Sequence, residues 1–433
     1  MALVTNRDRV KMSVKEKMME PFRTLKEFNP NTRYCVVLEP LWGIPFNLYI
    51  TYASLYMLAL GLTNREIGLV SAVGLTFQMI FALAGGFITD RLGRRKTSII
   101  FDITAWTLPT LIWASAQNIH YFMIAGILNA SVRIVQNSWN CLMIEDARPE
   151  ERVHIYSWVE VANILAGFFA PFAGWLILKF SLVPAVRALY FFAFVSMTAM
   201  ILIRNKLTTE TKTGLIKIEE SKRYTVFQTF RQYPVALRLL VTNPAALTAF
   251  FLVLLNNIHI QLKNIFLGII LNRGLGLPQA DLAVFPAVTS AIVLFIYIFI
   301  MPALGRHDPK KPLLFGFITL ILSYGILLIA PMGSFMSAMI STVIGAVGYA
   351  LVTPFINSSF ANQVDDNHRA KTMSIVYAVI YGGTAPFSYL AGMMSALNPR
   401  FTAAFLLLVF TAGIGCLAIL KKLEKKSGSA DAV

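Results

Sequence analysis

The side chains best suited to chemistry in this chain are polar residues that recur inside long apolar segments. In the segment 121–144, an arginine and four amides fall at steps of three or four and so share one helix face: Asn129, Arg133, Gln136, Asn137 and Asn140. A guanidinium near the middle of a bilayer is costly unless it faces a cavity or a partner. We therefore expect Arg133 to bind a solute or to take part in coupling its transport to an ion.

Four further apolar segments carry polar residues that could face the same cavity. The candidates for binding or coupling are Asn47, Asn256, Asn257, His259, Lys263, Tyr349, Asn357, Tyr377 and Tyr381. Amides between membrane helices also serve as simple hydrogen-bond links. For each Asn and Gln candidate, such a structural role remains an alternative to solute binding. Lys263 could instead extend toward the interface, and His259, which titrates near neutral pH, is either a proton site or a core residue.

Three acids lie about one helical turn inside the ends of their apolar segments: Glu39, Asp102 and Glu160. Each is a candidate for a proton site or for a gating network, in which the expected partners are Arg94, Arg133 or Arg148. The middle of the apolar segments contains cations but no carboxylate. This favours a solute with negative charge, or an amphipathic solute that also contacts aromatic rings.

Composition places these residues in a membrane protein. Of the 433 residues, 56% are hydrophobic and 14% are charged, against roughly 45–50% and about 25% in soluble domains. The net charge is +16, but Lys and Arg gather at the ends of the apolar segments rather than in a basic domain, so no nucleic-acid partner is expected. The lipid bilayer is the expected surrounding.

Apolar runs long enough to cross a bilayer recur along nearly the whole chain. Twelve transmembrane helices are predicted, at 36–60, 65–89, 98–116, 121–144, 155–178, 184–203, 244–270, 281–304, 313–331, 334–360, 372–395 and 401–420. One set of loops, which includes both tails, contains 31 Lys or Arg against five in the opposite set. The positive-inside rule therefore predicts that both termini are cytoplasmic in a multi-pass protein of the plasma membrane.

The longest polar stretch divides the chain into two parts. The predicted domains are a cytoplasmic amphipathic N-terminal tail at 1–33, an N-terminal six-helix bundle at 34–203, a cytoplasmic linker at 204–243, a C-terminal six-helix bundle at 244–420, and a cytoplasmic tail at 421–433. No cleavable signal peptide is expected, because the first 33 residues lack an apolar stretch. Helices lying in the membrane interface are expected in the tail and in the second part of the linker.

The loop after the second predicted helix reads GFITDRLGRRK from Gly86 to Lys96. This pattern resembles the loop 2–3 signature of the major facilitator superfamily. Gly86 would allow a close helix contact and Gly93 a tight turn. The resemblance implies that Asp90 faces the helix that begins near Thr372, and that Arg94 pairs with an acid at the end of 121–144. The implied conformational latch comprises Gly86, Asp90, Arg91, Gly93, Arg94, Arg95, Glu145 and Asp146.

The resemblance also implies the fold: an all-α membrane protein with two pseudo-symmetric six-helix bundles and a solute site between them. The corresponding loop in the second half, Gly305 to Lys311, is basic and tight but lacks the full pattern. Arg133 followed by Gln136 resembles the fourth-helix signature of proton-coupled members, except that Asn137 replaces a glycine. The fifth helix keeps little of the drug-antiporter signature, which weakens multidrug efflux as a function.

The leading prediction is a secondary active transporter that moves a small organic solute by alternating access, coupled to protons and acting as a monomer. Three alternatives remain: an uncoupled facilitator or exchanger, a multidrug efflux antiporter, and a transport-inactive membrane sensor. No enzyme is expected, because the sequence has no phosphate-binding glycine loop and no nucleophile motif. It also has no His or Cys cluster at metal-ligand spacing, so neither metal nor cofactor is expected.

Overall fold

The structure, a computed structural model, describes Leu25 and residues 27–148, 151–222, 241–304, 310–361 and 369–430. Every regular element in these ranges is a helix. Most of the N-terminal tail, the second part of the linker and the core of the loop from Gly305 lie outside the described residues, so the expectations for them stay predictions. The same holds for the side chain of Asn357.

The first part of the chain forms the N-terminal set of helices. Its members are α3 (Pro30–Val37), α4 (Pro40–Ile50), α5 (Ala53–Ala59), α6 (Asn64–Leu92), α7 (Arg94–Asp102), a π-helical turn (Ile103–Thr107), α8 (Leu108–Ala114), α9 (Ile119–Asn129), α10 (Val132–Ile144), α11 (Arg152–Ala166), a 3-10 turn (Gly167–Phe169), α12 (Ala170–Phe180) and α13 (Leu182–Leu207). The short helix α14 (Lys212–Ser221) follows it in the linker.

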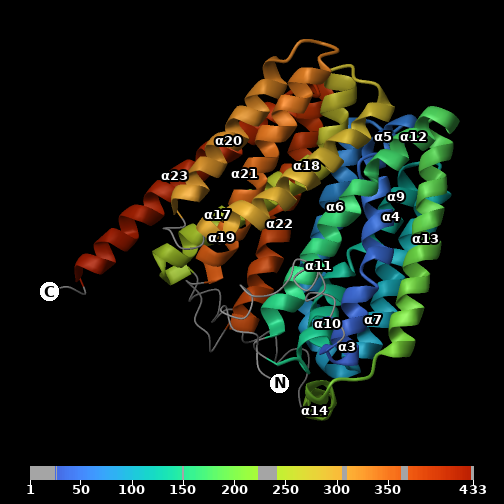
Figure 1. The fold of residues 1–433 in the computed structure, drawn as a ribbon, viewed down its shortest axis with the longest axis vertical. Helices are drawn as coiled ribbons and strands as arrows, with labels where there is room; N and C mark the ends of the chain where they lie inside the picture. The colour runs from blue at the N-terminus through green and yellow to red at the C-terminus, as the bar shows by residue number, and fades with distance from the viewer. Residues whose placement is uncertain are drawn as a thin grey trace, which may run out of the picture.

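The second part forms the C-terminal set of helices. Its members are α17 (Pro244–Ile269), a π-helical turn (Ile270–Gly274), a 3-10 turn (Gln279–Ala283), α18 (Val284–Phe295), a π-helical turn (Ile296–Ile300), α19 (Met301–Leu304), α20 (Lys310–Ile329), α21 (Phe335–Ala361), α22 (Arg369–Leu397) and α23 (Phe401–Ala430). The two sets stand side by side with their helices roughly along the long axis, and α6 and α22 run together between them (Figure 1).

Eight helices in the described ranges are long and apolar enough to cross a membrane. Three other predicted segments, 36–60, 98–116 and 121–144, are divided into shorter helices. Proline explains part of this, because it lacks a backbone N–H: Pro40 begins α4 and Pro45 lies inside it. The segment 98–116 is interrupted by the π-helical turn, and the segment 121–144 by a turn at residues 130–131.

Local sequence sets the limits of the longest helix of the N-terminal set. Helix α6 begins at a capping box, in which Thr63 and Glu66 bind each other's backbone N–H groups. It ends at Gly93, whose φ of 87° is in the left-handed region that glycine adopts without strain. The turn that the signature loop predicted is therefore present, and α7 starts directly after it.

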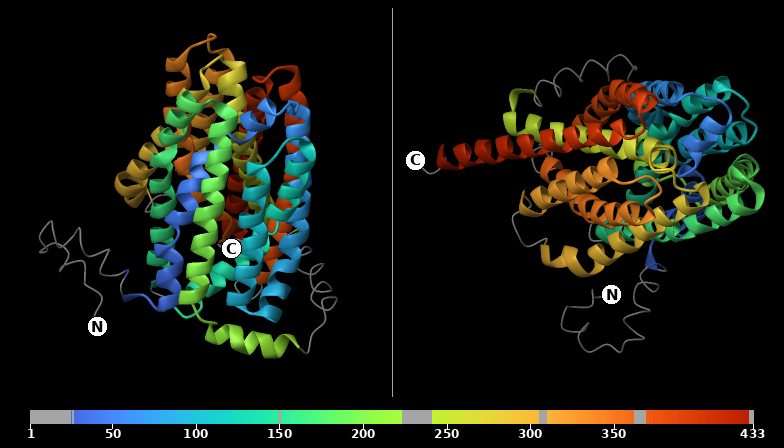
Figure 2. Two further views of the ribbon diagram at one scale, coloured as in Figure 1. Left: turned by 90° about the vertical axis from the view of Figure 1, so that its right-hand side faces the viewer. Right: turned by 90° about the horizontal axis from the view of Figure 1, so that it is seen from above.

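The two ends of the bundle differ. At one end, here called the sealed end, the backbones of α6 and α22 meet at Gly68 and Gly392, where a Cβ on Gly68 would lie 2.9 Å from the Cα of Gly392. The other end, here called the terminal end, contains the start of α3, the first labelled helix (Figure 1). There α14 crosses beneath the long helices and α23 extends past the bundle (Figure 2).

Candidate solute site

A central cavity of about 590 Å³ lies between the two sets of helices. Its lining is rich in aromatic rings: Trp42, Phe46, Tyr49, Trp106, Trp113, Phe122, Trp139, Tyr190 and Tyr381. Amides form a second group: Gln78, Asn129, Gln136, Asn257, Gln261 and Asn264. Charged groups form a third: Glu39, Asp102, Arg133 and Arg204. The cavity therefore offers stacking surfaces, hydrogen-bond groups and charge to one solute.

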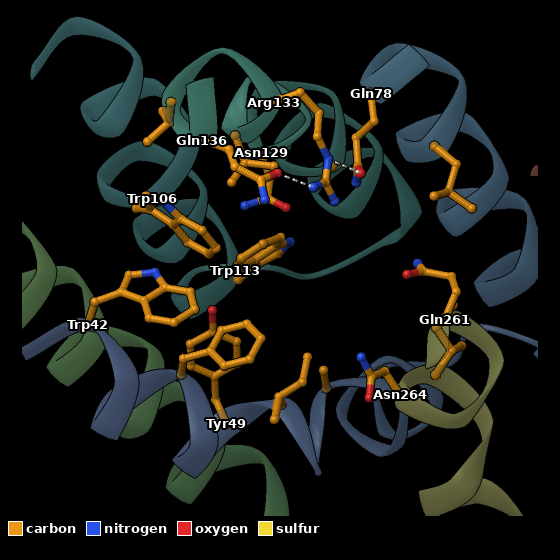
Figure 3. Close-up of a pocket in the computed structure, with 18 of the residues that line it drawn as sticks. Trp42, Tyr49, Gln78, Trp106, Trp113, Asn129, Arg133, Gln136, Gln261 and Asn264 are labelled. Atoms are coloured by element: carbon orange, nitrogen blue, oxygen red, sulfur yellow. Dashed lines mark hydrogen bonds between the residues drawn. The ribbon is translucent and has the colours of Figure 1, made fainter. Parts of the chain in front are cut away.

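Arg133 is the central charge of this cavity. Its Nε donates to Oε1 of Gln78 at 2.8 Å, and its Nη1 donates to Oε1 of Gln136 at 2.7 Å (Figure 3). The guanidinium also lies 4.0 Å from the ring centroid of Tyr381 on α22. No carboxylate among the described residues pairs with Arg133. Its positive charge is thus held in place by neutral groups and remains available to a ligand.

The aromatic rings form a continuous surface facing Arg133. Trp42 stacks on Phe46 with centroids 4.9 Å apart and meets Trp106 edge-on at 5.1 Å. In the close-up, the three labelled tryptophans and Tyr49 lie on one side, with the Arg133 group on another and the amides of α17 on a third (Figure 3). Offset and edge-to-face geometry of this kind also suits a planar guest. The tryptophans were not among the predicted site residues.

A buried ion pair lies at the edge of the same cavity. Nη2 of Arg204 donates to Oδ2 of Asp102, and both side chains are buried. The expectation that Asp102 would pair with Arg94, Arg133 or Arg148 was therefore wrong. Arg204 was assigned to the linker, but α13 continues to Leu207 and carries it into the bundle. Glu39, at the start of α4, lines the cavity within electrostatic range of Arg204, which is already paired with Asp102.

A side chamber of about 290 Å³ adjoins the central cavity and lies against α17, α18, α20 and α21. Lys263 and His259, both from α17, line it, and so do Asn47 and Tyr349. The ammonium of Lys263 lies 5.0 Å from the ring centroid of Tyr349. His259 is 1% exposed, shares a hydrogen bond of 2.9 Å with the hydroxyl of Tyr324, and meets Phe410 edge-on.

The signature loop forms a junction of charges at the terminal end. Arg94 pairs with Glu145 at 2.9 Å and with Asp90 at 3.0 Å. Glu145 is one of the two acids that the resemblance implied as its partner. The carboxylate of Glu210, in the linker, accepts hydrogen bonds from the backbone N–H groups of Arg94 and Arg95, at 2.9 and 3.1 Å. This caps the first turn of α7. Sequence analysis missed Glu210, which stands two residues before α14.

Three other members of this loop region have contacts of their own. Arg91 lies over the ring of Phe87, Nε and Nη2 of Arg95 donate to the carbonyl of Asn205, and Asp146 accepts from the backbone of Lys212. Gly86 is not at a close helix contact, since a Cβ there would meet nothing within 4 Å. Its neighbour Gly85 lies against the backbone of α10 instead, because it is one position round the helix.

A family comparison decides the identity of this architecture. Residues 42–358 match the family model described as the Major Facilitator Superfamily, and residues 264–432 match it a second time. The chain belongs to the major facilitator superfamily. No curated protein matches the sequence.

Solved structures of other transporters are similar to this facilitator in fold. A mutant of the nucleoside transporter NupG has a TM-score of 0.70 and 14% identity, over 91% of this chain and 99% of that one. The peptide transporter POT in complex with sulfate has a TM-score of 0.67 and 13% identity, over 92% and 94%. A POT family transporter in complex with 5-aminolevulinic acid has a TM-score of 0.67 and 12% identity, over 91% and 96%. At these identities the likeness establishes the fold.

The facilitator brings many of the predicted site residues together in the two cavities. Arg133, Gln136, Asn257, Tyr381, Glu39 and Asp102 line the central cavity, and Asn47, His259, Lys263 and Tyr349 line the side chamber. Several others line neither: Asn137, Asn140, Asn256, Glu160 and Tyr377. Asn137 donates to Thr89 of α6, so the polar face of α10 is shared between the cavity and a helix contact. Tyr377 stacks on Tyr381 from outside the cavity.

The present conformation of the facilitator is closed at the sealed end. There Asn64 donates to the carbonyl of Ser395 at 2.9 Å, and Arg65 donates to the hydroxyl of Tyr389 at 3.0 Å. Within the described residues, the hydrogen bonds and cation–ring contacts between the two sets all lie between the sealed end and the level of Arg133 and Tyr381. Each of these contacts joins a helix of the N-terminal set to a helix of the C-terminal set.

Proposed function

We propose that this facilitator is a secondary active transporter that moves a small organic solute by alternating access, coupled to protons. One observation carries the proposal. Arg133, with no carboxylate partner among the described residues, lies inside a cavity between the two sets and contacts both of them. A solute bound there would touch α10 and α22 together. Its binding would therefore favour one arrangement of the two sets of helices over another.

The proposed topology has twelve crossings in two six-helix bundles with both termini in the cytoplasm of a plasma-membrane protein. The three interrupted segments would each cross as broken helices, which membrane proteins tolerate where the backbone lines a cavity. Helix α22 would complete the count. In that orientation the sealed end is extracellular, and the central cavity faces the cytoplasm in this conformation. We propose the monomer as the working unit.

The proposed solute is anionic or amphipathic. The cations Arg133 and Lys263 would attract a negative group, and the aromatic surface from Trp42 to Trp113 would stack against an apolar or planar one. For the proton we propose Glu39, because it lines the cavity beside an arginine already paired with Asp102. Two acids that share one cation leave one negative charge that a proton can neutralise.

Uptake into lipid vesicles containing the purified protein tests this proposal. Solutes that raise its unfolding midpoint would first be found by screening organic anions, sugars, amino acids and cationic drugs. Uptake of a solute found in this way should rise with an imposed pH gradient. Counterflow that ignores the gradient would instead indicate an uncoupled facilitator or exchanger. Binding without any flux would indicate a sensor, and stabilisation by cationic drugs alone would favour multidrug efflux.

A further inference from the structure

The side chamber contains a cation that the protein leaves without a counter-charge. No Asp or Glu lines this chamber in the described part of the chain, and no carboxylate there pairs with Lys263. The ammonium lies over Tyr349 inside the chamber instead of reaching toward the interface. A lysine in a spanning helix is costly, and a ring face alone offsets only part of that cost. An anion beside Lys263 would offset the rest of that cost.

Several other polar groups of the chamber are already hydrogen-bonded within the protein. Ser323 and Ser341 bond each other at 3.0 Å, Thr289 donates to its own helix, and Asn47 donates to the carbonyl of Gly43. The N–H donors of Lys263 have no such acceptor among the described residues. The Nδ1 of His259, another residue that lines the chamber, is buried without a hydrogen-bond partner among the described residues.

The chamber lies next to the central cavity, and the two share part of their walls. Phe46, Ile50, Ile260 and Asn264 line both spaces. A solute that extends past these shared residues would have one end near Lys263 and the other near the tryptophans. The single cation of the chamber suits a group with one negative charge, and its volume of about 290 Å³ suits a small one. A carboxylate meets both conditions and accepts hydrogen bonds from an ammonium.

We propose that Lys263 binds the carboxylate of the transported solute in the side chamber, and that the solute is an aromatic monocarboxylate whose ring lies against Trp42 and Trp106. This inference rests on the proposed transport function and names its substrate class. Arg133, held by Gln78, Gln136 and Tyr381, then faces the body of the solute from the opposite side. The two cavities act as one site with an apolar end and a charged end.

Three probes with the same ring test the proposal: indole-3-propionate, its neutral amide and tryptamine. Each is titrated against the purified full chain, and its apparent affinity is taken from the shift of the unfolding midpoint. The carboxylate should bind about 10–100-fold more tightly than the amide, as a charge-assisted hydrogen bond allows. Tryptamine should bind most weakly, because its ammonium would meet that of Lys263.

Variants of one lysine give the decisive comparison. Lys263→Gln should abolish the preference for the carboxylate over the amide, while Lys263→Arg should keep it. Lys179→Gln is the matched control: Lys179 lies over Trp175 at 5.4 Å, a ring contact like that of Lys263, but lines neither cavity. The preference should survive in this control. Binding of the amide to Lys263→Gln would show that the variant is folded.

Three results would overturn the inference: a preference that survives Lys263→Gln, equal or tighter binding of the amide or amine by the unmodified chain, and no binding of any probe. A different result would contradict the proposed transport function. Carboxylate binding that depends on Lys263 without flux in vesicles would contradict transport and leave the anion site standing. Flux of other solutes, with no lysine-dependent preference among the probes, would contradict the site and leave transport standing.

Discussion

The guanidinium of Arg133 on α10 lies 4.0 Å from the ring centroid of Tyr381 on α22, so one cation–ring contact joins the two sets of helices inside the central cavity. The same arginine is fixed on its own side by Gln78 and Gln136. The aromatic ring is neutral, so it holds the guanidinium in position but leaves its positive charge free to bind an anion. The contact must also part when the two sets move relative to each other.

Replacing this arginine should remove solute binding. Arg133→Gln should weaken the binding of a stabilising solute by about 10–100-fold, because a hydrogen bond to a charged group is lost. Tyr381→Phe keeps the ring and should change affinity by about threefold or less, whereas Tyr381→Leu should weaken it further. Solute titrations followed by the unfolding midpoint give these values. Arg65→Gln is the control, since Arg65 stacks on Tyr389 outside the cavity; equal losses in both arginine variants would contradict a role at the site.

The glycine contact at the sealed end should determine the resting conformation. Gly68→Val would place its Cβ 2.8 Å from the carbonyl oxygen of Ser388 and should force α6 and α22 apart. Spin labels on Ala59→Cys and Leu397→Cys, with the native cysteines replaced, should then show a longer distance. Gly86→Val, in the same helix but facing open space, should leave it unchanged. An unchanged distance in the Gly68 variant would show that the contact does not set this state.

The buried ion pair should matter for stability. Asp102→Asn leaves the Arg204 guanidinium buried without its counter-charge and should lower the free energy of unfolding by about 3–5 kcal/mol. The double variant Asp102→Asn with Arg204→Met should lose less than the sum of the single variants. Glu220→Gln breaks the exposed pair with Lys217 and should cost about 1 kcal/mol or less. Denaturant unfolding in detergent measures the unmodified chain, Asp102→Asn, Arg204→Met, the double variant and Glu220→Gln. Additive losses would argue against coupling of the buried pair.

Glu39 and Glu160 should behave differently in proton coupling. Glu39→Gln cannot take up a proton, so uptake should no longer rise with an imposed pH gradient, while exchange of solute across the vesicle membrane continues. Glu160→Gln should keep the response, because Glu160 is exposed and lines neither cavity. Measurements of uptake and exchange in the same vesicles separate the two activities. A Glu39 variant that still follows the gradient would move the proton site elsewhere.

The sequence predicted those features that periodicity and local chemistry control. The helical segments, the turn at Gly93 and the polar stripe containing Arg133 all follow from spacing and residue type. The partner of Asp102 could not be predicted, because it depends on α13 continuing four residues past its expected end and bringing Arg204 into the bundle. The tryptophan surface was missed because aromatic residues are common in membrane helices, and only packing shows that Trp42 and Trp106 face one cavity.

The close approach of Gly68 to Gly392 has a consequence for the leakage of ions and protons across a membrane. Where two backbones come this close, no file of water molecules fits between them, and protons have no path along which to hop. In the present conformation, the contact between α6 and α22 therefore leaves no route for ions between these two helices. Side chains added at these glycines would be harmful first through leakage of current, whatever the solute.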